Sequence, residues 1–79
     1  MDYRMVILRK LYNRRIIGGK HTAIEHLTGG IPGHLVGEAK HVIAKLIQGG
    51  YLLPKPTGYG LQVSINPEKL SEVEDIIRE

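Results

Sequence analysis

Three Gly-Gly pairs divide this 79-residue chain into segments that leave room only for short helices and strands. The pairs are Gly18-Gly19, Gly29-Gly30 and Gly49-Gly50, and glycine commonly ends a helix because it adopts the left-handed conformation without strain. Four prolines add further interruptions, two of them in Pro54-Lys55-Pro56. The sequence therefore predicts a single small domain, residues 1–79, with a thin core.

Apolar residues recur at helical spacing in four of the segments. The predicted helices cover approximately residues 2–15, 22–28, 32–48 and 67–78. Asp2 is the expected N-cap of the first helix, and Thr22 with Glu25 fits a capping box at the start of the second. Asn66-Pro67 joins an N-cap residue to a proline at the first helical position, which predicts the start of the last helix.

The third predicted helix has one apolar face and one polar face. Its apolar stripe predicts inward side chains at Leu35, Ala39, Val42, Ile43, Leu46 and Ile47. The opposite row predicts outward side chains at His34, Gly37, Glu38, His41, Lys45 and Gln48. Gly37 costs about 1 kcal/mol relative to alanine inside a helix. Either another molecule approaches its backbone closely, which we prefer, or it is a tolerated glycine on a solvated face.

After Gly49-Gly50 the apolar pattern changes from helical to alternating. Residues 51–65 are predicted to form an antiparallel hairpin, with strands at 51–53 and 61–65. The alternation places Gln62 and Ser64 on the outer side of the second strand. Prolines cannot donate to a sheet, so those between the strands belong to the loop or to an edge.

The composition excludes several classes of protein. The chain has no cysteine, which removes disulfide frameworks, thiol nucleophiles and zinc fingers, and favours a reducing cytoplasm for so small a domain. The first residues lack the apolar run of a signal peptide. No stretch approaches the roughly 20 apolar residues of a membrane span, so a membrane is not an expected partner.

The net charge of +3 is unevenly distributed. Residues 1–20 carry six cationic side chains against one carboxylate, whereas residues 66–79 carry five carboxylates against two cations. In one interpretation the first and last helices lie side by side and pair their charges. In the other, one surface attracts phosphate and the opposite surface repels it.

The order of the predicted elements resembles the winged helix-turn-helix superfamily. The resemblance rests on residues 22–27, the turn Thr28-Gly29-Gly30, the helix 33–48 and the run 49–53 that enters the hairpin. It covers nearly the whole chain, and the tail after Asn66-Pro67 looks like small stand-alone archaeal winged-helix proteins. The resemblance implies a mainly α fold with a small β-hairpin: a three-helix bundle, a two-stranded wing and a C-terminal helix. It also implies that the third helix reads the major groove of DNA.

Three sets of residues are candidates for contact with nucleic acid. On the third helix they are His34, Gly37, Glu38, Lys40, His41 and Lys45. In the hairpin they are Lys55, Thr57 and Tyr59. At the end of the first helix they are Arg14 and Arg15, and Lys20 follows it. Lys55, at a loop tip between two prolines, is expected to contact phosphate. The ring of Tyr59 is expected either to reach the nucleic acid or to pack back on the hairpin.

The sequence does not favour catalysis or metal binding. His34 and His41 share a helix face but stand about 10 Å apart, too far for one ion. Gly19-Lys20-His21-Thr22 lacks the upstream glycine spacing of a phosphate-binding loop. We therefore expect no enzyme activity, no metal, no cofactor and no small-molecule substrate.

Two functions follow from these patterns. The first is a transcription-regulator-like protein that binds double-stranded DNA. A homodimer contact is a further expectation, either at the basic first helix or at the last helix, where the apolar pair Ile76-Ile77 lies. The second is a winged helix that binds RNA or another protein in the transcription or translation machinery. Glu38 and the small number of cations on the third helix favour the second.

Overall fold

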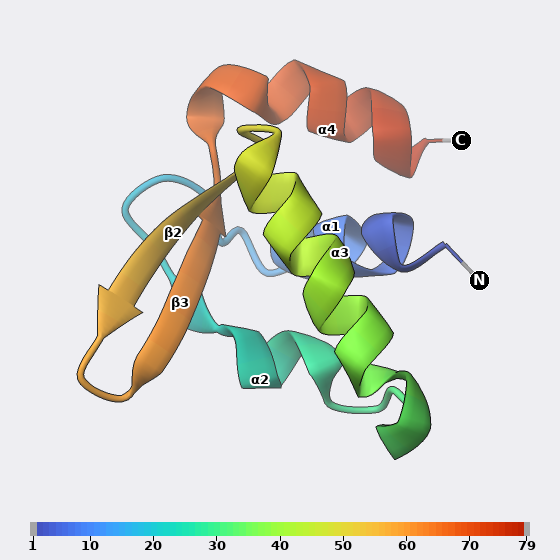
Figure 1. Cartoon of the computed structure of the whole chain (residues 1–79). Coiled ribbons are helices and arrows are strands. Elements are labelled where there is room, and N and C mark those ends of the chain that lie inside the picture. Colours follow the sequence, from blue (N-terminus) through green and yellow to red (C-terminus); the bar gives the residue numbers. More distant parts are fainter. Residues whose placement is uncertain (1, 79) are drawn as a thin grey trace.

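The computed structural model describes residues 2–78, which form four α-helices and a three-stranded antiparallel sheet (Figure 1). The α-helices are α1 (Tyr3–Asn13), α2 (Ile24–Thr28), α3 (Val36–Gln48) and α4 (Leu70–Ile77). The strands are β1 (Thr22–Ala23), β2 (Leu52–Thr57) and β3 (Gly60–Ile65). Two short 3-10 helices, η1 (Gly33–Leu35) and η2 (Pro67–Lys69), lead into α3 and α4. Helices and hairpin follow one another in the predicted order.

The sheet has one strand more than the sequence predicts. Its order is β1-β3-β2, with β3 in the centre, and Thr22 of β1 pairs with Val63 of β3. The predicted two-stranded hairpin is confirmed as β2 and β3, and β1 is an additional strand of the same sheet. Because β1 has only two residues, it shows no alternation by which the sequence could reveal it.

The first strand of the hairpin continues through both prolines. β2 pairs Pro54 with Val63 and Pro56 with Leu61, so the assignment of residues 54–57 to a loop is wrong, and the alternative that places the prolines on an edge is confirmed. β2 is an edge strand, and an edge tolerates proline where the backbone N–H would point away from the sheet. The two positions consequently offer no donor to a further strand, which protects the edge from pairing with another chain.

The core is built around α1. Ile7, Leu8 and Leu11 are fully buried, and α1 packs against α2, α3, α4 and β3. The other elements contribute the buried side chains Leu27, Ala39, Ile43, Leu46, Leu52, Val63, Ile65 and Val73. Within residues 2–78, no helix combines the length and the apolar character that a membrane span requires.

The predicted apolar stripe of α3 is confirmed. Ala39, Ile43 and Leu46 are buried, and the remaining members of the stripe, Leu35, Val42 and Ile47, are half-buried against the core. The α-helix itself begins at Val36, after the 3-10 turn, rather than at residue 32.

Two of the predicted helix caps are confirmed and one is wrong. The Asp2 carboxylate accepts hydrogen bonds from the N–H groups of Arg4 (3.0 Å) and Met5 (3.4 Å). Asn66 accepts a hydrogen bond from the N–H of Glu68 (3.1 Å) at the start of η2. The capping box does not form, because Thr22 lies in β1 and Ala23 occupies the N-cap position of α2.

Ser64 is buried, although the alternation in β3 predicts that it faces solvent. Its hydroxyl donates a hydrogen bond to the carbonyl of Gly18 (3.0 Å), and residues 16–18 run beside the end of β3. Ile17 forms a parallel bridge with Ile65 there. Residues 16–18 therefore cover the part of the sheet that the alternation in β3 predicts to face solvent.

α1 and α4 lie side by side, as one interpretation of the charge distribution requires. The contact is made by hydrogen bonds: the Arg9 guanidinium donates to the carbonyl of Ile77 (2.8 Å), and the Tyr12 hydroxyl donates to the Glu74 carboxylate (2.6 Å). The one ion pair within 4 Å in residues 2–78 joins Arg4 to Asp2, at 3.7 Å. Charge pairing between the two helices therefore has a small role.

The bond between Tyr12 and Glu74 predicts a change of stability at high pH. Its hydrogen bond to Glu74, together with burial, raises the pKa of Tyr12 above its ordinary value of 10.0. Below pH 10.0 the phenol is protonated in both the folded and the unfolded state, and the bond stabilises the fold fully. As the pH rises through the folded pKa, this contribution is lost.

We therefore expect Tyr12→Phe to be less stable than the wild type near neutral pH, with the difference shrinking above pH 10.0. Urea unfolding followed by circular dichroism at several pH values measures it. Tyr59→Phe, which removes a hydroxyl at the exposed hairpin tip, is the control and should leave stability unchanged. Equal stability of Tyr12→Phe and wild type at every pH would contradict the assignment.

Candidate nucleic-acid interface

The outer face of α3 is exposed along its length. Figure 1 views the molecule with α3 in front and α1 behind it. The candidate residues of this face are all exposed: His34, Gly37, Glu38, Lys40, His41 and Lys45. They are polar or lack a side chain, and Ala44, a small apolar residue, is also exposed on this side of α3.

The charged groups of this face are free to bind. Lys40 and Lys45 oppose the single carboxylate of Glu38. Within residues 2–78, no carboxylate lies within 4 Å of either lysine ammonium. His34 and His41 add two imidazoles that can donate or accept hydrogen bonds. The face is thus mildly cationic and rich in hydrogen-bonding groups.

Gly37 lies in the first turn of α3 on open surface. A Cβ atom built at this position would meet nothing within 4 Å. The fold itself therefore gives no packing reason for a glycine here. The sequence leaves two explanations for Gly37, a tolerated glycine on a solvated face or the close approach of another group to its backbone. In the second explanation, the approaching group must belong to another molecule.

The tip of the hairpin presents an aromatic ring to solvent. Tyr59 is 100% exposed, so the alternative in which its ring packs back on the hairpin is wrong. Thr57 holds the turn: its hydroxyl donates to the carbonyl of Gly60 (2.7 Å) and accepts from the N–H of Tyr59 (3.1 Å). Thr57 is therefore occupied in positioning Tyr59.

Lys55 lies inside β2 rather than at the tip of a loop. It pairs with Gln62, and strand alternation places it with Leu53 on the face opposite to the buried Leu52. Both side chains are exposed, Leu53 at 39%. Leu53 is absent from the candidates taken from the sequence. Continuing the alternation through the prolines would have shown that it shares the face of Lys55.

The third set of candidates lies away from the hairpin tip. Arg14 and Arg15 precede residues 16–18, which are bonded to Ile65 at the base of the hairpin. At the tip of the hairpin Thr57 pairs with Gly60, and at its base Leu52 pairs with Ile65. These two positions are five residues apart along β2, which corresponds to a distance of about 17 Å. In Figure 1 the connection that carries these arginines and Lys20 runs behind the hairpin. The structure therefore does not bring them together with Tyr59 at the hairpin tip.

Two cations near the N-terminus hold helix ends. Lys10 Nζ donates to the carbonyls of Leu27 (3.0 Å) and Gly29 (3.1 Å), which caps the C-terminal end of α2. Arg9 caps α4 in the same way through Ile77. A cation at a helix C-terminus also interacts favourably with the helix dipole. Both side chains are therefore held against the fold, and the Lys10 ammonium keeps one N–H donor beyond these two bonds.

Ile76 and Ile77, suggested by the sequence as a homodimer contact, are half-buried and pack against the core. Among residues 2–78, no three histidine, aspartate or glutamate side chains gather as a metal site requires. Comparisons with models of known protein families, with curated proteins and with solved structures find no match to this chain. The functional assignment consequently rests on the surface just described.

Proposed function

We propose that this chain is a winged helix-turn-helix domain that binds double-stranded DNA, with α3 in the major groove and the hairpin tip on the adjacent backbone. The observation that carries the proposal is the exposed polar face of α3 beside a projecting hairpin with a fully exposed tyrosine at its tip. The order of α2, a glycine-containing turn, α3 and the hairpin supports it.

The dimensions and chemistry of α3 suit a major groove. The groove is about 12 Å wide and accepts one α-helix, whose outer side chains then reach the base edges. His41 and Lys45 lie one turn apart on the exposed face, where each can donate to guanine acceptors or to phosphate. Lys40 lies to the side of this row and suits a phosphate contact. Glu38 can accept a hydrogen bond from cytosine.

The number of available cations implies a modest affinity. Arg9 and Lys10 hold helix ends, and Arg14, Arg15 and Lys20 lie away from the hairpin tip. Phosphate contacts therefore come from Lys40, Lys45 and Lys55. Each such contact releases a counterion, so affinity should fall with rising salt.

We expect Lys45→Gln to weaken binding to a duplex of random sequence and to reduce the salt slope of log K by about 0.9, because it removes one phosphate contact. Fluorescence anisotropy over a series of salt concentrations measures the slope. Lys20→Gln removes the same charge from the distant connection and is the matched control, with a smaller expected change. Equal effects of the two variants would mean that net charge, rather than the α3 face, governs binding.

A protein partner is the second candidate function. Leu53 and Tyr59 are the large apolar side chains exposed in the described part of the chain, and both lie on the hairpin. Aromatic and apolar side chains are enriched at the centres of protein interfaces. Failure to bind duplex DNA even at low salt would reject the first proposal and leave the hairpin as the surface to investigate.

A further inference from the structure

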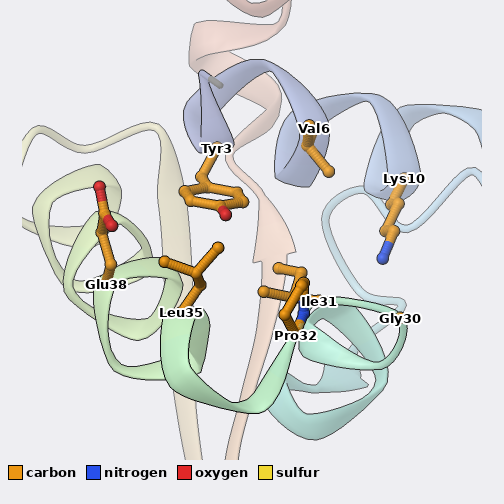
Figure 2. Close-up of a pocket in the computed structure, with 8 residues that line it drawn as sticks. All are labelled: Tyr3, Val6, Lys10, Gly30, Ile31, Pro32, Leu35 and Glu38. Atoms are coloured by element: carbon orange, nitrogen blue, oxygen red, sulfur yellow. The ribbon is translucent and has the colours of Figure 1, made fainter.

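A cavity of about 580 Å³ lies between α1 and the segment that leads into α3 (Figure 2). Tyr3 and Val6 line it from α1, and Ile31, Pro32 and Leu35 line it from the opposite side. Small-molecule sites typically have volumes of about 300–1,000 Å³ and mostly apolar walls. The cavity has the size and the lining of such a site.

The two ends of the cavity carry opposite charges. Figure 2 shows Lys10 at one end and Glu38 at the other. The Lys10 ammonium has three donors, and two of them bind the neutral carbonyls of Leu27 and Gly29. Within residues 2–78, no carboxylate lies within 4 Å of this ammonium. One donor and an uncompensated positive charge therefore remain at the cavity.

The apolar walls favour an apolar occupant over water. Val6, Ile31 and Leu35 are only half-buried, although each packs against the core or lines the cavity. The cavity is partly open to solvent, but its walls supply few of the two to four polar partners that an ordered water needs. An apolar body can therefore displace water from this space at little cost, while its polar group stays at the Lys10 end.

We propose that this cavity binds a small apolar carboxylic acid. The carboxylate accepts a hydrogen bond from Lys10, and the apolar body packs between Tyr3 and Leu35. A charge-assisted hydrogen bond of this kind is roughly twice as strong as a neutral one. The site does not depend on the proposed binding of DNA.

The test compares 1-naphthoate with the neutral 1-naphthamide, which has the same ring system without the charge. Isothermal titration calorimetry gives the affinities, and NMR of the backbone amides locates the site. We expect saturable binding of 1-naphthoate with shifts in residues 3–10 and 30–38. 1-Naphthamide should bind at least about 10-fold more weakly, because a hydrogen bond to a charged group contributes more than a neutral one.

Two variants make the test specific. Lys10→Gln should lower the affinity for 1-naphthoate to that for 1-naphthamide, whereas Arg78→Gln, the same charge change at the end of α4, should leave both affinities unchanged. Because Lys10 also caps α2, Val6→Trp provides an independent test by filling the cavity. It should abolish binding of both probes while keeping a folded circular dichroism spectrum.

The proposal is overturned if 1-naphthoate shows no saturable binding, or if the wild type binds acid and amide equally. It is also overturned if a folded Val6→Trp variant binds 1-naphthoate as the wild type does. In that case the probe occupies a different part of the surface.

Discussion

Replacing Leu11 with alanine is expected to lower the free energy of unfolding by about 3 kcal/mol, within the 2–5 kcal/mol typical of buried leucines. Leu11 is fully buried, and it belongs to the helix that packs against α2, α3, α4 and β3. A small domain has only about 5–15 kcal/mol of stability in total. The variant should therefore be partly unfolded at mild urea concentrations. Urea unfolding followed by circular dichroism measures the loss.

Leu53→Ala is the matched control, because it removes the same atoms from a side chain that is 39% exposed on the hairpin. Its effect should stay below about 1 kcal/mol, since little apolar surface returns to water. A similar loss of stability in both variants would contradict the placement of the core around α1.

Replacing Tyr59 with alanine should weaken binding to duplex DNA by roughly 5- to 150-fold, if the hairpin tip contacts the nucleic acid as proposed. At the DNA backbone the Tyr59 side chain acts as a hydrogen-bond donor. A hydrogen bond contributes about 1 kcal/mol between neutral groups and up to about 3 kcal/mol to a charged phosphate, which gives this range of affinity. The free energy of unfolding should change by less than about 0.5 kcal/mol, because the ring is 100% exposed.

Tyr59→Phe keeps the ring and is the informative comparison. It should lose a similar share of the affinity if the hydroxyl donates to a backbone phosphate, and should retain the affinity if the ring makes the contact. Anisotropy titrations of the three proteins at one salt concentration measure this. Wild-type affinity in Tyr59→Ala would exclude the hairpin tip from the interface. In that event α3 alone would have to account for any binding.

Much of the fold is predictable from local patterns in the sequence. The apolar stripe of α3, the N-cap at Asp2 and the opening of the last helix at Asn66-Pro67 each depend on a few neighbouring residues. The features that the sequence does not reveal depend on distant segments. Ser64 is buried because residues 16–18 cover it, and β1 exists because Thr22 and Ala23 reach β3.

The candidate site is predictable to a smaller extent. Helical periodicity correctly places His41 and Lys45 on an exposed face of α3. It cannot show that Arg9 and Lys10 are bonded to the ends of other helices instead of facing solvent. The partner of Arg9 is 68 residues away along the chain, and those of Lys10 are 17 and 19 residues away. The cavity is also invisible in the sequence, because Val6 and Leu35 meet across it only after the chain has folded.

The capping of α2 and α4 by side chains of α1 has a consequence for how the chain unfolds. α2 has five residues and α4 has eight, and isolated helices shorter than about 12–15 residues are marginal in water. Lys10 completes the end of α2, and Arg9 completes the end of α4. When α1 detaches, the last carbonyl groups of α2 and α4 lose the hydrogen bonds that Lys10 and Arg9 donate to them. Local opening of α1 should therefore lead to global unfolding. The domain should behave as one cooperative unit, without a partly folded form that retains α2 and α3 alone.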